Sequence, residues 1–203
     1  MRPDLDLVQG LVGPRSHVID LGCGDGALLA RLIGALGCTG YGVERSSEGF
    51  HACVARGVPV IQGDLEAELE RLDGEIFDLA VLSLTLQATA RPAFVLRQMA
   101  RIARRSIVSL PNMGNWRHRA DLALRGRMPV GGALPYSWHE TPNIHLCTLG
   151  DLEALLAEMD LRVLRRLLLS TSGGRARASG ILRPNLLAAG AVYLVEPAGS
   201  GSA

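Results

Sequence analysis

Acidic and glycine residues alternate in one short segment near the start of the chain. Its sequence is Val18-Ile19-Asp20-Leu21-Gly22-Cys23-Gly24-Asp25-Gly26. The apolar start is typical of a buried strand, and glycines directly after a strand let a ligand approach the backbone because they have no side chain. Asp20 adds a carboxylate two residues before the first glycine, which attracts a cation and repels a pyrophosphate. The segment therefore predicts a site for a cationic ligand against a glycine-lined loop.

The spacing of these glycines differs from that of nicotinamide-dinucleotide sites. The segment has the pattern G-x-G-x-G, whereas dinucleotide-binding folds have G-x-G-x-x-G. S-adenosylmethionine (AdoMet) presents an ammonium and a sulfonium where a dinucleotide presents a pyrophosphate, so the acid favours AdoMet. We expect AdoMet or S-adenosylhomocysteine (AdoHcy) as the cofactor. The expected binding residues of this segment are Asp20, Gly22, Cys23, Gly24 and Gly26.

Three later strand ends add residues that suit the same ligand. Glu44 lies about 20 residues past the glycines, where a carboxylate can accept both ribose hydroxyls. Asp64 can accept from an adenine amino group while the backbone N–H of Leu65 meets a ring nitrogen, and Ser83 ends a strand beside the expected crevice. Simpler alternatives exist for each residue: tight turns for the glycines, a solvated strand end for Glu44 and a helix cap for Asp64.

Short β-rich apolar segments alternate with longer segments of helical periodicity along the chain. This order predicts an α/β protein with a Rossmann-like, class I AdoMet-methyltransferase fold: a seven-stranded, mostly parallel sheet with helices on both faces. The expected strands span residues 17–22, 39–44, 58–62, 77–83, 105–110, 161–169 and 189–195, and the expected helices span residues 26–36, 47–56, 66–72, 91–104 and 149–159. Pro92 and the pair Thr148 and Asp151 mark two helix starts.

Length and composition bound the other possibilities. With 203 residues, 48% of them hydrophobic, we expect one methyltransferase-like domain over residues 1–203, with a disordered tail at 198–203. A net charge of +1 and the lack of an Asp-Pro-Pro-Tyr or Asn-Pro-Pro motif disfavour nucleic acid as a partner, and no apolar segment is long enough for a membrane span. The four cysteines are widely spaced, which predicts free thiols, no metal site and a cytoplasmic location.

Charge is distributed unevenly along the chain. Residues 64–78 contain seven acids and one arginine, whereas residues 161–183 contain six arginines and no acid. Two solvated faces explain this pattern, and so does a docking surface for another protein.

Residues 112–147 form an insertion that is much longer than the usual connection between a strand and a helix. The insertion holds both tryptophans, three of the five histidines and four arginines. Such residues close a pocket as a lid or contact a partner protein. The lid or partner candidates are Asn112, Trp116, Arg117, Tyr136, Trp138 and His145. No motif identifies a catalytic residue, which methyl transfer does not require, since positioning supplies most of its acceleration.

Several motifs together resemble one known family. They are the glycine segment followed by Leu28-Leu29, then Leu82-Ser83-Leu84-Thr85-Leu86-Gln87-Ala88, Pro111-Asn112-Met113-Gly114-Asn115-Trp116, Gly126-Arg127-Met128-Pro129-Val130, Leu134-Pro135-Tyr136-Ser137-Trp138 and Thr141-Pro142-Asn143-Ile144-His145. The chain is similar over most of its length to the MetW family of methionine biosynthesis proteins. Leu84 replaces a polar residue of the family pattern, and Met113 and Asn115 depart from its Pro-Asn-Phe-Gly-His-Trp motif.

The resemblance implies a bacterial role in methionine biosynthesis together with a homoserine O-acyltransferase (MetX). In that family the methyltransferase-like chain supports full acyltransferase activity, and no methyl acceptor is established. Three functions therefore stay open: a binding and regulatory subunit of the acyltransferase, an active small-molecule methyltransferase, and a subunit whose pocket binds nothing.

Overall fold

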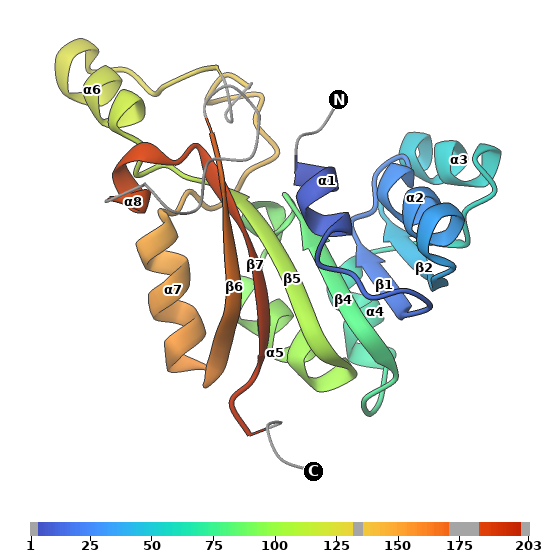
Figure 1. Cartoon of the computed structure of the whole chain (residues 1–203). Coiled ribbons are helices and arrows are strands. Elements are labelled where there is room, and N and C mark those ends of the chain that lie inside the picture. Colours follow the sequence, from blue (N-terminus) through green and yellow to red (C-terminus); the bar gives the residue numbers. More distant parts are fainter. Residues whose placement is uncertain (1–3, 132–135, 171–182, 200–203) are drawn as a thin grey trace.

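A single seven-stranded sheet organises the chain. The computed structural model describes residues 4–131, 136–170 and 183–199, so residues 200–203 of the expected tail lie outside the described residues. The strand order is β3-β2-β1-β4-β5-β7-β6 (Figure 1). The strands are β1 (His17–Leu21), β2 (Thr39–Glu44), β3 (Val60–Gln62), β4 (Phe77–Ser83), β5 (Ala103–Pro111), β6 (Leu161–Leu169) and β7 (Gly190–Pro197).

Strand direction confirms the prediction of a mostly parallel sheet. Strands β1 to β5 pair in parallel, and β7 lies antiparallel between β5 and β6. Strand β1 is the point where the strand order reverses, because β2 follows it on one side and β4 on the other. Asp20 on β1 lies opposite Gly42 on β2 and Val81 on β4. Ligands of such sheets bind outside the carboxyl ends of the strands at this reversal.

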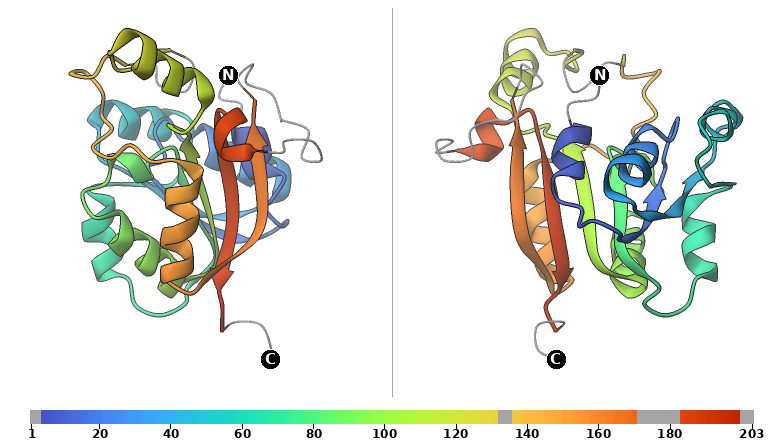
Figure 2. Two further views of the ribbon diagram at one scale, coloured as in Figure 1. Left: turned by 90° about the vertical axis from the view of Figure 1, so that its left-hand side faces the viewer. Right: turned by 45° about the vertical axis from the view of Figure 1, so that its right-hand side comes forward.

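Helices cover both faces of the sheet. On one face lie α1 (Asp4–Gln9), α2 (Ala27–Leu36) and α3 (Ser47–Ala55), and on the other lie α4 (Leu65–Arg71), α5 (Pro92–Ile102) and α7 (Leu149–Glu158) (Figures 1 and 2). The remaining helices are η1 (Leu86–Ala88), a short 3₁₀ turn, α6 (Trp116–Arg125) and α8 (Pro184–Leu187). The chain therefore has the three-layer arrangement that the alternating sequence pattern predicts.

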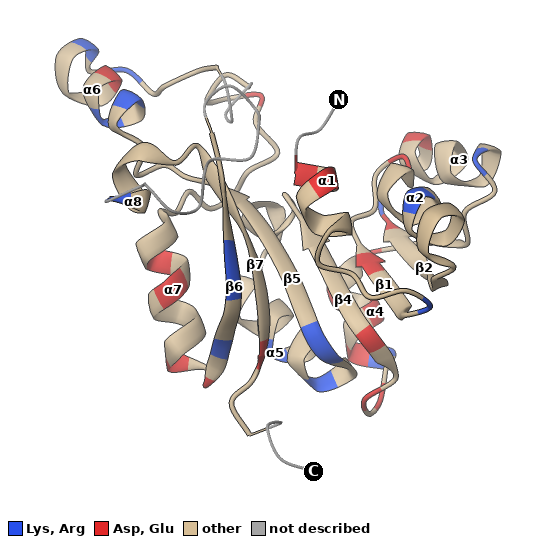
Figure 3. Ribbon diagram, in the orientation of Figure 1, with Lys and Arg blue, Asp and Glu red and all other residues tan. Residues whose placement is uncertain are grey.

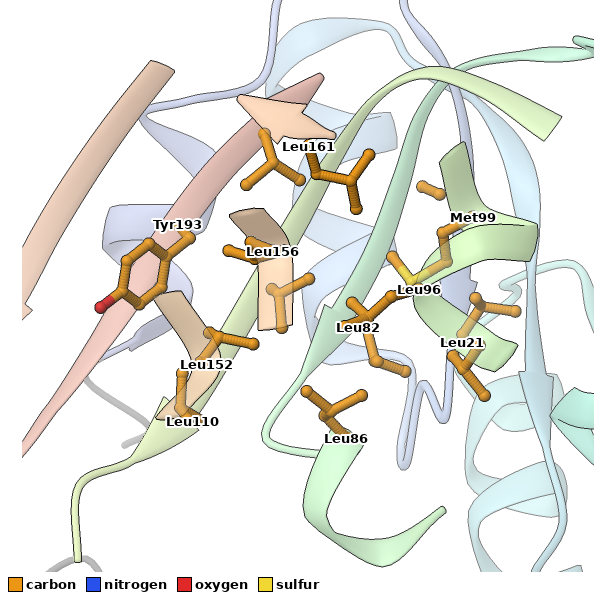
Figure 4. Close-up of a cluster of buried hydrophobic side chains, with 14 of the residues drawn as sticks. Leu21, Leu82, Leu86, Leu96, Met99, Leu110, Leu152, Leu156, Leu161 and Tyr193 are labelled. Atoms are coloured by element: carbon orange, nitrogen blue, oxygen red, sulfur yellow. The ribbon is translucent and has the colours of Figure 1, made fainter. Parts of the chain in front are cut away.

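The alternation of side chains along β4 shows how each face obtains its core. Leu79 and Val81 pack with α1 and α2, whereas Ala80 and Leu82 pack with α5 and α7. Figure 4 shows the second of these clusters, with Leu82 among side chains from α5, α7 and β7. Because both faces are covered, β4 is apolar along nearly its whole length.

The expected elements are confirmed with small shifts at their ends. Pro92 stands at the first position of α5, and Thr148 forms a capping box with Asp151 at the start of α7. Helix α5 ends at Ile102 rather than at residue 104, because Ala103 is already buried and paired with Phe77 of β4. The sequence pattern does not predict α1, η1, α6 or α8, because these helices are short or have no clear apolar periodicity.

Ion pairs compensate much of the uneven charge in the part of the chain that the structure describes. Five of the seven acids in residues 64–78 lie within 4.0 Å of a guanidinium: Glu66 and Glu70 pair with Arg91, Glu68 with Arg71, Asp73 with Arg101 and Glu75 with Arg104. Figure 3 shows where the charged residues lie along the ribbon. On the basic side, Arg162 pairs with Glu196, and Arg166 pairs with Glu153. These pairs favour solvated faces over a docking surface as the explanation of both segments. Within the described residues, no helix has the length and apolar character needed to cross a membrane.

Candidate functional site

The glycine segment forms a tight loop where β1 meets α2. Gly22 and Gly24 both have positive φ angles, 73° and 59°, which favour glycine. A Cβ atom at Gly22 would lie 2.6 Å from a methyl carbon of Thr85, so this position also lacks room for a side chain. A Cβ atom at Gly24 would meet nothing within 4 Å, so the space beside it is open. The loop therefore presents backbone to an open region, as the spacing predicts.

Glu44, at the end of β2, supports this loop directly. One carboxylate oxygen accepts from the backbone N–H of Gly24 at 2.8 Å, and the other accepts from that of Ser46 at 2.8 Å. Glu44 also lines the larger cavity at the strand ends. Each carboxylate oxygen has a second lone pair, so Glu44 can hold the loop and still accept hydroxyl hydrogens.

Asp64 caps a helix, which is one of the two roles that its position in the sequence allows, and it also lines the larger cavity, where it could accept from adenine. Its side chain caps α4, where Oδ1 accepts from the backbone N–H groups of Glu66 at 2.9 Å and Ala67 at 3.2 Å. Both bonds use the same oxygen, so Oδ2 keeps its lone pairs for a ligand. Leu65 is the first residue of α4, where backbone N–H groups have no partner within the helix, and both residues line the cavity.

Two cavities of unequal size meet at Gly22. The larger has a volume of about 430 Å³ and is lined by Glu44, Asp64, Leu65 and the segment after β4. The smaller has a volume of about 20 Å³, room for about one water molecule, and its lining is Leu5, Asp20, Gly22, Cys23, Asp25, Ala27, Leu28 and Ser83. All of the predicted cofactor residues except Gly24 and Gly26 line one of these two cavities. A Cβ atom at Gly26 would meet Cys53 and Val58, so this glycine packs against the protein interior. The two ends of the crevice differ greatly in free space.

Helix α1 closes the smaller end. Asp4 is 1% exposed and accepts a hydrogen bond of 2.6 Å from the hydroxyl of Ser83. The Ser83 hydroxyl lies 3.2 Å from that of Ser109, and the Ser109 hydroxyl accepts from the backbone N–H of Leu84 at 3.0 Å. This chain of contacts links α1 to the segment after β4, which lines the larger cavity. No sequence pattern predicts this contact, because Asp4 and Ser83 are 79 residues apart.

Cys23 contributes packing and backbone to the site. Its side chain is 5% exposed, and its Sγ atom lies 3.7 Å from that of Cys53 on α3. Burial, with the nearby Asp20 carboxylate, raises the pKa of the Cys23 thiol far above its usual range, so the thiol stays protonated. All four cysteines are free. Among the described residues, no group of three or more potential ligand side chains could hold a metal ion.

An ion pair that the sequence analysis missed builds the outer wall of the larger cavity. Glu66 on α4 is 8% exposed and accepts from the backbone N–H groups of Ala90 and Arg91 at 2.8 and 3.0 Å. It also accepts from the guanidinium of Arg91 at 2.6 Å. Burial raises the pKa of the Glu66 carboxyl, but these hydrogen bonds outweigh it, and the pKa lies below its ordinary value. Glu66 therefore holds α4 to the start of α5.

The insertion reaches the cavity through the short turn η1. The backbone N–H groups of Ile144 and His145 both donate to the carbonyl of Gln87, at 2.8 and 2.9 Å, and Ile144 lines the larger cavity. The Gln87 amide donates to the carbonyl of Leu84, a residue with a φ of 55°. Its Oε1 atom is buried with no donor among the described residues.

Most lid or partner candidates are exposed, but Asn112 is not. Trp116, Tyr136 and Trp138 are 48%, 52% and 74% exposed, and Arg117 and His145 are exposed as well. Asn112, in contrast, is fully buried, so its side chain is not itself part of an exposed surface that a partner could touch.

Asn112 instead joins three segments at the base of the insertion. Its amide donates to the carbonyls of Asn185 and Ala188 at 2.9 Å, and its oxygen accepts from the N–H groups of Gly114 at 2.9 Å and Leu149 at 3.3 Å. These bonds connect the end of β5 with α7 and α8, so Asn112 is a structural residue of the fold.

Solved structures share this fold. A methyltransferase from Thermotoga maritima, titled a SAM-dependent methyltransferase and possible histamine N-methyltransferase, superposes with a TM-score of 0.67 at 18% identity over 96% of this chain and 87% of its own. The [4+2]-cyclase SpnF superposes with a TM-score of 0.65 at 17% identity over 96% of this chain and 81% of its own. Together with the glycine loop and the strand order, these matches place the chain in the class I AdoMet-methyltransferase fold.

The family is more specific than the fold. Residues 2–195 match the family described as "Methionine biosynthesis protein MetW", and the chain belongs to it. The "Bifunctional methionine biosynthesis protein MetXA/MetW" of Rhodopirellula baltica is 32% identical over 167 residues, 78% of this chain and 27% of the relative. The chain thus spans little more than a quarter of the length of this curated relative. The resemblance of the sequence motifs to the MetW family is confirmed.

The substitution Glu66→Gln tests the Glu66 interaction. We expect it to lower the free energy of unfolding by about 1–3 kcal/mol near neutral pH, because it weakens several hydrogen bonds to a buried carboxylate. The folded pKa of Glu66 is lowered, so this stabilisation is complete above the unfolded pKa of about 4.3 and is lost as the pH falls through the folded pKa. Urea unfolding of both proteins over a pH series measures the difference.

The matched control for this test is Glu70→Gln. Glu70 lies on the same helix and pairs with the same Arg91, but its side chain is 53% exposed, so the change should cost under about 1 kcal/mol. A stability difference for Glu66→Gln that does not shrink at acid pH would contradict the ionic role of Glu66.

The substitution Asn112→Ala tests the role of this residue in joining the segments. We expect a loss of roughly 2–4 kcal/mol in the free energy of unfolding, because buried backbone groups lose their partners. The control Asn143→Ala, at a partly exposed position of the same insertion, should change stability by less than about 0.5 kcal/mol. Thermal and urea unfolding provide the measurement, and equal effects of the two substitutions would refute the assignment.

Proposed function

We propose that this chain is an AdoMet- or AdoHcy-binding subunit of methionine biosynthesis that acts with a homoserine O-acyltransferase. The choice of partner rests on the relative from Rhodopirellula baltica. Its name, MetXA/MetW, describes one bifunctional protein of methionine biosynthesis. Linking two modules in one chain raises their effective concentration, which suits modules that work together. In this proposal residues 1–203 act as one cytoplasmic domain, with neither nucleic acid nor membrane as a partner.

The geometry of the crevice supports the ligand. Glu44 faces the larger cavity, where it can accept the ribose hydroxyls, and Asp64 with Leu65 can pair with adenine. Asp20 and Ser83 line the smaller cavity, where the ammonium of the amino-acid end would bind beside the Asp20 carboxylate. Gly22 lines both cavities and the space beside Gly24 is open, so the backbone of the loop can approach a ligand there, and Cys23 lines the smaller cavity. Gly26 would act indirectly, by allowing the tight turn into α2.

The difference in size between the two cavities suggests how ligand binding changes the conformation of the protein. The free space of about 20 Å³ is small for the amino-acid end of AdoMet, so we infer that α1 moves away from Ser83 when the ligand enters. Binding then changes the contacts that link α1 to the segment after β4. A ligand that favours one arrangement of α1 shifts the population toward it, which is the basis for regulation of a partner.

The fold does not by itself support methyl transfer. SpnF has the same fold and is titled a [4+2]-cyclase, so the chemistry of this fold depends on the site. The described cavity residues provide carboxylates and backbone for a ligand but no evident site for a methyl acceptor. We therefore place regulation of the acyltransferase ahead of methyl transfer, with AdoMet tuning an early step of the pathway that produces its own precursor. The exposed candidates Trp116, Arg117, Tyr136, Trp138 and His145 belong to a lid or a partner surface.

Ligand binding can be measured by titration calorimetry with AdoHcy, AdoMet and adenosine. We expect the unmodified chain to bind AdoHcy, and Glu44→Ala to weaken it by about tenfold or more, since hydrogen bonds to a charged group contribute about 1.5–3 kcal/mol. Gly24→Asp should weaken it as well, because its side chain would occupy the open space beside the loop.

The control for the calorimetry is Glu48→Ala, an exposed glutamate on α3 that does not line the cavity. Its AdoHcy affinity should equal that of the unmodified chain. A lack of binding heat from the unmodified chain with AdoHcy and AdoMet would favour a pocket that binds nothing and contradict the ligand proposal.

The partner proposal is tested by assaying acetyl and succinyl transfer to homoserine by the acyltransferase, with and without this chain. We expect a higher rate in its presence and a further change on adding AdoMet, whose size depends on Glu44. Methyl-labelled AdoMet in the same mixtures reports transfer to any small molecule. An unchanged acyltransferase rate would exclude the partner role, and labelled product would favour the methyltransferase alternative.

A further inference from the structure

Helix α6 contributes nothing to the core of the protein. None of its ten residues is buried, and it stands beyond the carboxyl ends of the strands (Figures 1 and 2). The Asn115 side chain caps its first turn, and Gly126 ends it with a φ of 61°. A helix of this length without tertiary packing is marginal in water, because most helical stability in proteins comes from a packed apolar face. The two caps alone contribute little to the stability of α6.

The surface of α6 and the residues after it is unusually apolar. Nine of the fifteen exposed large apolar side chains among the described residues lie within residues 116–146. Leu122 and Leu124 on α6 are 43% and 85% exposed, and both tryptophans of the chain are exposed. We define the α6 surface as Trp116, Leu122, Leu124, Met128 and Val130. Apolar side chains grouped in this way mark interaction sites more often than ordinary solvent-facing surface.

Charge restricts what can cover this surface. Residues 116–130 contain four arginines and one acid, Asp121, which pairs with Arg125 at 3.0 Å (Figure 3). The segment therefore has a net charge of +3. In a symmetric dimer that buries α6 against its own copy, two segments of like charge would face each other. A partner with an apolar groove and an acidic rim fits the surface better.

The base of α6 is held firmly even though its surface is free. The Asn115 amide donates to the carbonyls of Leu187 and Ala188 at 3.2 and 3.0 Å, and the Arg119 guanidinium donates to the carbonyl of Gly114 at 2.7 Å. Anchoring of this kind fixes the direction of the helix before a partner arrives, which reduces the entropy lost on binding. The helix is therefore presented for docking and is not part of a closed lid.

We propose that α6 and the rest of the α6 surface dock into an apolar, acid-rimmed groove of the homoserine O-acyltransferase. This inference rests on the proposed function, because the occupant follows from the bifunctional relative, in which 73% of the length lies outside the segment that matches this chain. The mode is an exposed helix inserted into a groove that contacts it on more than one side, because Leu122 and Leu124 are two residues apart and lie on different sides of α6. Both leucines and Trp116 serve as apolar anchors. The surface is separate from the ligand crevice, so the two can be tested independently.

The double variant Leu122→Asp with Leu124→Asp tests the docking surface. Purified acyltransferase is titrated with the unmodified chain and with the variant, and the dissociation constants are compared. We expect the variant to bind at least about 30-fold more weakly, which corresponds to about 2 kcal/mol in total, because it replaces two apolar anchors by charges. Both leucines are exposed, so the fold should survive, and AdoHcy calorimetry together with urea unfolding checks that it does.

The matched control is Val54→Asp, which introduces a single aspartate at a 56% exposed apolar position on α3. Its affinity for the acyltransferase should equal that of the unmodified chain. If the unmodified chain binds the acyltransferase and the double variant binds equally well, the docking inference is overturned while the proposed function stands. If the unmodified chain does not bind the acyltransferase, the proposed partner itself is wrong. A dimer in sedimentation that the double variant dissociates would identify a second copy as the occupant and overturn the inference.

Discussion

The loops after β1 and β4 meet at Gly22, where a side chain would collide with Thr85. This close approach divides the space outside the strand ends into a large and a small cavity, both lined by Gly22. The backbone of the glycine loop can lie there only because it adopts positive φ angles that other residues rarely accept. Asp20 lines the smaller cavity, and Glu44 and Asp64 line the larger, so this contact lies between the two groups of carboxylates.

The carboxylates around the crevice are structural residues as well as potential ligand-binding groups. Glu44 holds Gly24, Asp64 caps α4, and Glu66 holds the start of α5. Each accepts backbone N–H groups, which keeps the negative charges in place without a bound ligand. The ribose and adenine of a ligand would then meet Glu44 and Asp64 in positions that are already set, so the reorganisation on binding is confined to the end of the crevice that α1 closes.

The insertion has two different ends. One end is tied into the fold by Asn112, which is fully buried, and the other touches the cavity wall through Ile144. Between them α6 is presented to solvent with its apolar side chains uncovered. This arrangement separates ligand contact from partner contact within one segment, and the bonds at Gln87 connect that segment to the site.

Sequence periodicity and spacing were enough for the fold class, and they also predict which residues line the crevice. Alternating apolar segments predict the seven strands, and the glycine spacing with Asp20, Glu44 and Asp64 predicts the ligand crevice, because these signals lie within single elements or at their ends. The motif at residues 82–88 and those of the insertion carry the resemblance to the MetW family, which the family match confirms. Neither kind of signal required knowledge of long-range contacts.

Tertiary structure alone decided the contacts between distant segments. Asp4 meets Ser83 across 79 residues, Cys23 meets Cys53 across 30, and Glu66 meets Arg91 across 25. Asn112 was a lid or partner candidate together with Trp116. Its side chain is buried and donates hydrogen bonds to backbone carbonyls more than 70 residues away in the sequence. Burial and pairing of this kind depend on which helices the sheet brings together, and a periodic pattern along the chain describes only the face that each element presents, not the residue that will meet it.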